Sequence, residues 1–414
     1  MGKAENRFWK FIIKHRLKIL VLVSTLIAAY SRFVWRGFIT GDMEWFLLPW
    51  YHAITSFDGL RGLSAQVGNY QISYQTLIAL MKYLPVHPVY AYKGLSILFD
   101  FLLGAAAAAC VYELSHSTFK ASLTYMIIIN LPTVVLNSSA WGQCDSIFTF
   151  FLVMTFLFLL KQKYIPAFVF YGLAFSFKLQ AVFLLPFLLF YYVWSRHISI
   201  FHFLLIPGTM IVASLGGIIQ GRGILDPFSI YLKQADYYKR ISLNYPSFWN
   251  LMVLNDAEDE LDHYAEMSPL CMGITVILLT VLMIWLIRKK KLNFPQLLLT
   301  AALMMYTCLL FLPAMHERYG YPLLIFSVMI CMLFPRAIPV AMGLIIIDMQ
   351  TYGMYLFQKE TLPWEALTLI NIACYAFLGY ITVKAVNRTE LDWPESPENR
   401  KEGDACGRAQ PEGA

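Results

Sequence analysis

Charged residues are scarce in this sequence. Only 14% of its 414 residues are Asp, Glu, Lys or Arg, whereas a typical soluble domain has roughly 25%. Hydrophobic residues make up 58% of the chain, and its mean hydropathy is +0.57. This composition argues against a set of soluble domains. Because the backbone crosses hydrocarbon only when its hydrogen bonds are satisfied, the composition indicates one all-α, polytopic integral membrane protein.

Several motifs are also missing, and each absence narrows the function. The seven Cys are scattered without a C-x-x-C pair, which argues against a disulfide framework or a zinc site. There is no alternation typical of barrel strands. The sequence has no Walker-type glycine loop, Rossmann fingerprint or H-E-x-x-H motif, so a nucleotide-driven pump is not indicated. The positive charge has the pattern of an inner membrane face, so nucleic acid is not an expected partner.

Long apolar runs predict about 12 transmembrane helices, since a span needs about 20 mostly apolar residues. We expect these helices at 18–36, 90–112, 120–138, 146–160, 164–177, 179–194, 198–219, 268–287, 296–312, 319–334, 337–354 and 364–385. The runs 146–160 and 164–177 are short enough to be tilted or partly re-entrant.

The predicted helices belong to one transmembrane domain, residues 1–386. It has two long loops on its outer side, 37–89 and 220–267. In the first of these, Tyr70 to Leu84 is expected to form an amphipathic helix in the headgroup plane. Residues 387–414 are rich in Pro, Glu and Gly, and we expect a disordered cytoplasmic tail.

The basic residues predict an orientation. More of them precede the first apolar run than follow it: Lys3, Arg7, Lys10, Lys14, Arg16 and Lys18 against Arg32 and Arg36. By the positive-inside rule the N-terminus is cytoplasmic. Every second turn after it is also basic, including those around Lys120, Lys163 and Arg336. An even number of spans then places both termini of this multi-pass cell-membrane protein in the cytoplasm.

Polar side chains gather in four short segments, all on the predicted extracytoplasmic side. These are Gly41-Asp42-Met43-Glu44-Trp45, Trp141-Gly142-Gln143-Cys144-Asp145, Phe177-Lys178-Leu179-Gln180 and Met315-His316-Glu317-Arg318-Tyr319. In an irregular loop, Asp42 and Glu44 allow one carboxylate to act as a general base while the other orients it or binds a cation. An acidic cap at the membrane interface is the alternative.

The second and third segments add a carboxylate and a cation. Asp145 begins a predicted helix, where its charge is favourable, and Trp141, Gln143 and Asp145 are candidates for one substrate pocket. Lys178 lies in an apolar run, where a lysine is costly unless it snorkels, pairs or lines a polar cavity. A phosphate is an attractive partner for it, with Gln180 beside it.

The fourth segment contains two potential phosphate ligands. Arg318 offers a planar fork of donors to phosphate oxygens, and His316 can also donate. Free N–H groups at the start of the next helix favour an anion as well. The alternative is an interfacial ion pair in which Glu317 neutralises Arg318, with Tyr319 in an aromatic belt rather than a substrate wall.

Two carboxylates, Asp100 and Asp348, fall inside predicted spans. A charge in this position is expensive and needs a partner. We expect structural pairing across the bundle rather than a proton relay.

Taken together, these segments resemble the GT-C superfamily of polytopic glycosyltransferases. Gly41-Asp42-Met43-Glu44, with Trp50 and Ile54-Thr55, resembles the first-loop pattern of the endoplasmic-reticulum glucosyltransferases of asparagine-linked glycan assembly. Trp141 to Ser146 and Met315 to Tyr319 resemble bacterial relatives of the GPI-anchor second mannosyltransferase, which often have Phe where Cys144 stands. The resemblance spans most of residues 37 to 335.

The resemblance implies an inverting glycosyltransferase. Its members take a hexose, with mannose favoured here, from a polyprenyl-phosphate sugar donor, and the acceptor is a glycan, lipid or protein. It implies that Asp42 is the catalytic base and that Lys178, His316 and Arg318 bind the donor phosphate. No metal ligand is assigned, although Glu44 and Asp145 would suit a divalent cation, Mg²⁺ or Mn²⁺. Two rivals need no base: a transporter or flippase of lipid-linked saccharides, and a noncatalytic membrane subunit of a glycan assembly complex.

Overall fold

The computed structural model describes residues 2–235, 239–252, 259–289 and 291–388. This part of the chain is helical and contains no strand, apart from an isolated bridge between Ser242 and Met315. Most of the tail predicted to be disordered, residues 389–414 of 387–414, lies outside the described residues, as do residues 253–258 in the second long loop.

Six helices in the described part are long and apolar enough to cross a membrane. They belong to α1 (Lys3–Trp35), α4 (Pro88–Ser115), α13 (Asp259–Ile287), α14 (Phe294–Phe311), α16 (Ile338–Phe357) and α17 (Trp364–Val386). A seventh candidate is a broken span, residues 118–130 and 132–141, bent by 50°. The all-helical membrane architecture therefore agrees with the prediction, whereas the count of about 12 spans is not confirmed.

The remaining predicted spans fall on shorter apolar helices. These are α5 (Thr118–Asn130), α6 (Pro132–Val135), α7 (Asp145–Leu160), α8 (Tyr164–Phe177), α9 (Leu185–Ser195), α10 (Leu205–Ala213) and α15 (Tyr321–Leu333). Pro is found in the first turn of α6, α9 and α15, where its missing N–H costs no intrahelical bond. Such breaks divide long apolar runs into shorter helices and place polar segments between them.

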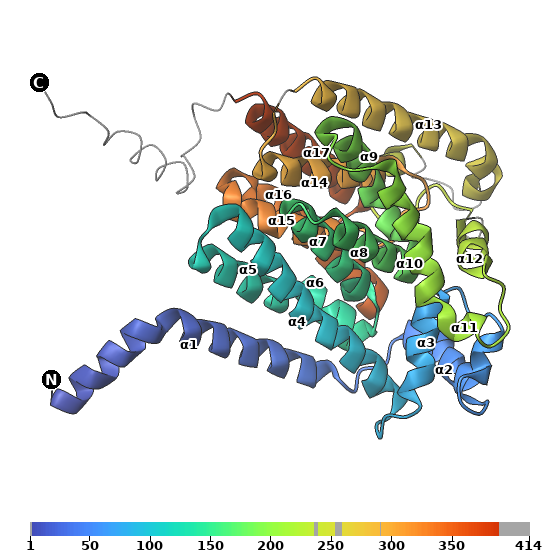
Figure 1. Cartoon of the computed structure of the whole chain (residues 1–414), viewed down its shortest axis with the longest axis horizontal. Coiled ribbons are helices and arrows are strands. Elements are labelled where there is room, and N and C mark those ends of the chain that lie inside the picture. The colour runs from blue at the N-terminus through green and yellow to red at the C-terminus, as the bar shows by residue number, and fades with distance from the viewer. Residues whose placement is uncertain (1, 236–238, 253–258, 290, 389–414) are drawn as a thin grey trace, which may run out of the picture.

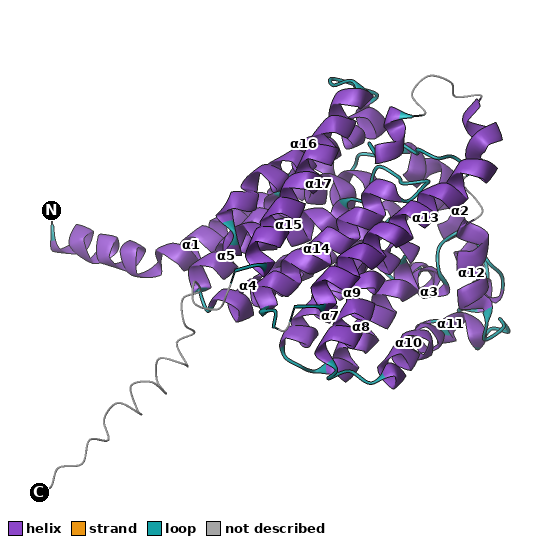
Figure 2. Cartoon of the chain, turned by 90° about the horizontal axis from the view of Figure 1, so that it is seen from above, coloured by secondary structure: helices purple, strands orange, loops and turns teal. Residues whose placement is uncertain are grey.

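Burial separates a central pair of helices from those at the edge. α14 buries every side chain from Pro295 to Leu310, and α15 buries those from Tyr321 to Cys331. Figure 2 shows α14 near the middle of the bundle. By contrast, α1 lies along one edge (Figure 1) and leaves apolar side chains such as Leu22 and Leu26 exposed. Exposed apolar side chains on a long helix are expected where it faces lipid.

Four small helices gather at one end of the bundle, opposite the start of α16 (Figure 1). They are α2 (Leu48–Thr55), α3 (Ile72–Met81), α11 (Leu215–Ile218) and α12 (Asp226–Ala235). The expected amphipathic surface helix corresponds to α3, and that prediction is wrong. Four consecutive side chains from Ile72 to Gln75, including polar Ser73 and Gln75, are buried, because α3 packs against α2, α8 and α11, so its polar residues do not form a face toward the headgroups.

The two carboxylates inside predicted spans have different surroundings. Asp100 pairs with buried Arg32 of α1, whose Nη2 lies 2.8 Å from Asp100 Oδ2. Ser138 donates to the same carboxylate at 2.5 Å, so the predicted structural pairing is confirmed for Asp100. Asp348 is buried as well. Within the described residues no cation forms an ion pair with Asp348, so the expected pairing is not found there.

Candidate active site

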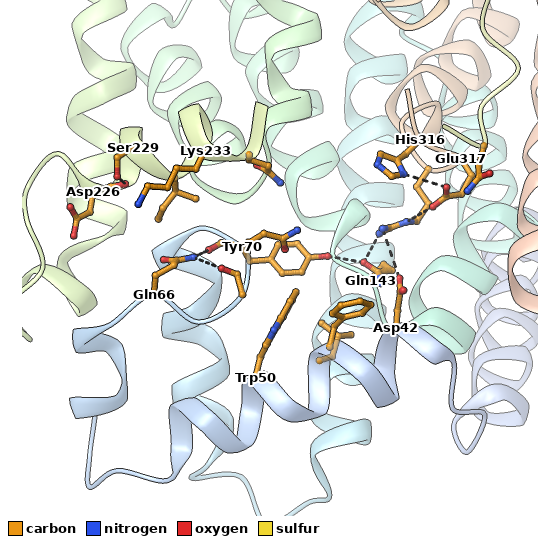
Figure 3. A pocket seen from close by; sticks show the side chains of 18 of the residues that line it. Asp42, Trp50, Gln66, Tyr70, Gln143, Asp226, Ser229, Lys233, His316 and Glu317 are labelled. Atoms are coloured by element: carbon orange, nitrogen blue, oxygen red, sulfur yellow. Dashed lines mark hydrogen bonds and ion pairs between the residues drawn. The ribbon is translucent and has the colours of Figure 1, made fainter. Parts of the chain in front are cut away.

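A cavity of about 750 Å³ opens at the end of the bundle that holds α2, α3 and α12. Five of the predicted site residues line it: Asp42, Gln143, His316, Glu317 and Arg318. Figure 3 shows that Asp42, Gln143, His316 and Glu317 come from segments far apart in the sequence and lie around one space. The structure thus brings together the first, second and fourth polar segments.

Asp42 is held by hydrogen bonds on both carboxylate oxygens. Its Oδ2 accepts from the indole of Trp141 at 2.8 Å and from the Gln143 amide at 3.0 Å. Its Oδ1 accepts from the hydroxyl of Tyr355, and Arg318 Nη2 lies 3.9 Å from Oδ2. The side chain remains 14% exposed. Asp42 is therefore an oriented carboxylate that still faces the cavity.

Local backbone geometry places Trp141 and Gln143 against Asp42. A π-helical turn, Leu136–Trp141, ends at Gly142, whose φ is +72°. Glycine adopts this left-handed conformation without strain, and a Cβ there would lie 2.6 Å from the Met43 side chain. The chain then turns back, and the Gln143 N–H donates to the Asn137 carbonyl at 3.0 Å. π-Helical turns often occur at functional sites.

Lys178 and Asp145 form a buried ion pair. Lys178 Nζ lies 2.5 Å from Asp145 Oδ1, and the two side chains are only 8% and 2% exposed. Asn137 donates to Asp145 Oδ2 at 2.8 Å. Lys178 has an extended backbone between α8 and a short 3-10 helix, Leu179–Leu184. Among the alternatives for this lysine, the structure therefore shows pairing, in a break between helices.

Arg318 connects the separate parts of the site. Its Nη1 donates to Gln143 and lies 3.5 Å from Asp145 Oδ2. Its guanidinium also lies over the Trp141 ring, 4.9 Å from the centroid, a favourable cation–π position. Although burial opposes the charge, Asp145 and other neighbouring anionic groups hold the pKa of Arg318 above its usual range. Arg318 is thus a fixed cation near the centre of the site.

Glu317 is a buried carboxylate in the same segment. Its Oε1 lies 3.3 Å from Arg318 Nε, and its Oε2 lies 3.6 Å from His316 Nδ1. Burial alone would raise its pKa, but the contacts with His316 and Arg318 lower the pKa of Glu317 to about 2. Its stabilising charge is consequently present above the ordinary pKa and lost only as the pH falls toward 2. The ion pair between Glu317 and Arg318, given above as the alternative to phosphate binding, is therefore present.

A second, smaller pocket of about 60 Å³ adjoins the large cavity. The three predicted phosphate ligands, Lys178, His316 and Arg318, all line it, together with Gln180 and Tyr319. One water needs roughly 10–15 Å³, so the pocket admits a group of several heavy atoms. His316 and Arg318 line both spaces, and the pocket is therefore adjacent to the cavity that Asp42 borders.

Glu44 is the one predicted catalytic residue that the structure places apart. The segment that we expected to be an irregular loop is helical from Gly41, with a π-helical turn at Met43–Leu47. Residues at i and i+2 of a helix do not face each other. Glu44 is accordingly exposed, and the cavity lining does not include it.

We expect Glu44→Gln to leave the sugar transfer that the resemblance implies within about threefold of wild type, because Glu44 lies outside the cavity lining and a surface substitution changes the free energy of unfolding by only about 0.5 kcal/mol. The measurement is the initial rate of sugar transfer in purified protein at saturating donor. A loss as large as that caused by a change at Asp42 would show that the side chain reaches the reaction when substrate is bound.

Sequence reasoning missed two tyrosines that touch the central residues. Tyr70 donates to Gln143 Oε1 at 2.8 Å. Tyr355, from the last turn of α16, donates to Asp42, and its ring stacks on Trp141 with centroids 4.5 Å apart. Tyr355 had no signal in the sequence, because an aromatic residue at the end of a predicted span fits a membrane-interface belt equally well.

The opposite wall of the cavity is formed by α12, in the second long loop. Asp226, Ser229 and Lys233 lie across the cavity from Asp42 in Figure 3. Their spacing of three and four residues places them on one helix face. Trp50 and Tyr70 lie between the walls, with ring centroids 5.4 Å apart. The cavity thus combines polar groups and aromatic faces, a lining suited to a polyhydroxylated molecule.

The comparisons with known proteins bear on one segment of the chain. Residues 138–218 match the family model described as mannosyltransferase (PIG-M). The match contains Trp141, Gln143, Asp145, Lys178 and Gln180 and covers about a fifth of the chain. No curated protein matches the sequence. With the apolar helices, the match supports a membrane glycosyltransferase of the GT-C type with mannosyltransferase activity.

Proposed function

We propose that this protein is an inverting mannosyltransferase that uses polyprenyl-phosphate mannose as donor. The observation that carries the proposal is the adjoining pair of spaces. Lys178, His316 and Arg318 line the small pocket, and Asp42 borders the large cavity. Such a site can hold a phosphate and a sugar while presenting a carboxylate to an acceptor hydroxyl.

In the proposed reaction Asp42 removes the proton from the acceptor hydroxyl as a general base. The acceptor oxygen then forms a bond to the anomeric carbon of mannose. The bond from that carbon to the phosphate oxygen breaks, and polyprenyl phosphate leaves with the electron pair. Attack opposite the leaving group inverts the anomeric configuration, and no covalent enzyme intermediate forms.

The cations of the site are fixed before substrate arrives. Lys178 is anchored by Asp145, and Arg318 by Glu317 and Gln143. Donors that are already oriented toward developing negative charge stabilise a leaving phosphate without reorganising during the reaction. His316, which also borders the small pocket, adds a donor on the same side.

The proposal includes the orientation predicted from the basic residues. Both termini are cytoplasmic, and the cavity opens on the extracytoplasmic face of the membrane. There a lipid-linked donor presents its phosphate at the bilayer surface. The acceptor is a glycan, a lipid or a protein on that face.

A divalent cation, Mg²⁺ or Mn²⁺, stays a prediction. Within the described residues no three His, Cys, Asp or Glu side chains form a group suited to a metal ion. Asp145 is occupied by Lys178 and Asn137, and Glu44 is exposed away from the cavity. Asp145 and Glu44, the two residues considered as ligands of such a cation, therefore do not face the same space. Transfer rates in EDTA, with and without added Mg²⁺ or Mn²⁺, test the requirement.

The direct test is an assay of purified protein in nanodiscs with polyprenyl-phosphate mannose that is radiolabelled in the sugar. We expect release of unlabelled polyprenyl phosphate and appearance of the label in an acceptor fraction from the membranes of the source cells. Polyprenyl-phosphate glucose is the matched control for the sugar, and GDP-mannose for the lipid. Efficient use of GDP-mannose in nanodiscs, or movement of intact donor across the bilayer of proteoliposomes without transfer, would contradict the proposal.

A further inference from the structure

A separate groove lies at the opposite end of the bundle from the candidate active site. It has a volume of about 250 Å³ and runs between the segment that precedes α16 and the last turns of α17. Arg336 lies two residues before α16 and Tyr355 near its end. A helix of 20 residues is about 30 Å long. The groove is therefore not an extension of the active-site cavity.

The floor of the groove is apolar. Leu333, Phe377 and Ile381 contribute to it, and Phe377 is 37% exposed. α16 and α17 both belong to the helices that are long and apolar enough to span a membrane. An open apolar groove between two such helices is a natural position for a hydrocarbon chain, because water would wet it at a cost that grows with its area.

Three cations line the same groove: Arg336, Lys384 and Arg388. All three are exposed. The lining contains no Asp or Glu, and no carboxylate of the described residues forms an ion pair with any of the three. Lys384 Nζ lies 3.3 Å from the Tyr380 hydroxyl, which leaves other donors of this ammonium for a ligand. The groove thus joins an apolar floor to a positively charged rim.

We propose that the groove binds one anionic phospholipid. Its phosphate contacts Arg336, Lys384 and Arg388, and one acyl chain lies over Leu333, Phe377 and Ile381. Basic pockets between transmembrane helices recognise anionic headgroups in this way, mostly on the cytoplasmic side. The positive-inside pattern places these three cations on that side. The segment after residue 388 is acidic in composition, but a polar segment does not match the apolar floor.

The test uses the full chain, purified and analysed by native mass spectrometry with dioleoyl phosphatidylglycerol and dioleoyl phosphatidylcholine as probes. The test variant combines Arg336→Ala with Lys384→Ala. The control combines Lys120→Ala with Lys163→Ala, which removes equal charge from other turns of the same predicted face. We expect about thirtyfold weaker phosphatidylglycerol binding in the test variant, the effect of two membrane-surface cations, and little change in the control.

A second variant tests whether phosphatidylglycerol binding requires the groove itself and not only the positive charge of this surface. Phe377 lines the groove and is 37% exposed, so Phe377→Asn makes the floor polar without changing charge, and we expect reduced phosphatidylglycerol binding, with the melting temperature as the control for folding. Equal binding of the two lipids by the wild-type protein would overturn the proposal, as would equal losses in the test and control variants. A wild-type protein that binds phosphatidylglycerol only after removal of residues 389–414 would assign the groove to that segment instead.

Discussion

Asp42→Asn is expected to lower the rate of mannosyl transfer by about 10²–10⁴-fold, the usual contribution of a general base. An amide has almost the same shape as a carboxylate. Its oxygen can still accept from Trp141 and Gln143, and its NH₂ group can donate to the Tyr355 hydroxyl oxygen, so the contacts around position 42 survive. What disappears is the ability to take a proton. The measurement is release of polyprenyl phosphate at saturating donor.

Donor binding provides the internal control for this prediction. The proposed phosphate ligands line a pocket whose walls do not include Asp42, so the dissociation constant of labelled donor for Asp42→Asn should stay within about threefold of wild type, a change of about 0.65 kcal/mol. Asp58→Asn makes the same chemical change at an exposed position outside the cavity lining and should leave transfer intact. Full activity in Asp42→Asn would remove the base from the mechanism.

The convergence of the polar segments was largely predictable from the sequence. Apolar runs can be located because each must satisfy its backbone in lipid. The segments between them that carry Asp42, Gln143 and Arg318 then fall on one predicted side of the membrane. The structure brings these three side chains into direct contact. The sequence also indicated that Lys178 has a specific role, because a lysine in an apolar run is costly unless it snorkels, pairs or lines a polar cavity.

The partners of these residues were not predictable, because they depend on packing between distant segments. Tyr355 contacts a residue 313 positions away, and nothing in its surroundings separates it from an interfacial tyrosine. Arg32 illustrates the same limit. In the sequence it weakens the charge asymmetry around the first helix, but in the structure its guanidinium is buried against Asp100. Arg32 therefore pairs with a buried carboxylate, and its charge does not indicate the orientation of the first helix.

The local backbone geometry was also not predictable from the sequence. Apolar periodicity cannot distinguish an irregular loop from the helical segment that contains Asp42, and that difference decides where Glu44 points. The same applies to α3, whose polar Ser73 and Gln75 are buried by neighbouring helices rather than exposed to headgroups. In both cases side-chain direction follows from the tertiary arrangement, which the sequence of one segment does not contain.

Lys178 permits a test that separates phosphate binding from folding. In the single variant Lys178→Met, Asp145 remains buried without its main partner, and breaking a buried pair in this way costs about 3–5 kcal/mol. We expect a lower melting temperature together with loss of donor turnover. That result alone would not distinguish a structural lysine from a ligand of the donor.

The double variant Lys178→Met with Asp145→Asn removes both charges at once. The amide oxygen introduced at position 145 can still accept from Asn137, which now donates to the Asp145 carboxylate, and no unpaired charge remains buried at this pair. Part of the lost stability should return, because this pair no longer leaves an unpaired charge buried, although the amide NH₂ group loses the partner that Asp145 Oδ1 has in Lys178. Donor affinity should nevertheless stay about 10–150-fold below wild type, the effect of one lost charge-assisted hydrogen bond. Thermal unfolding and binding of labelled polyprenyl-phosphate mannose measure the two quantities on the same samples. If affinity returns together with stability, Lys178 supports the fold alone, and the donor phosphate must be held by Arg318 and His316 without it.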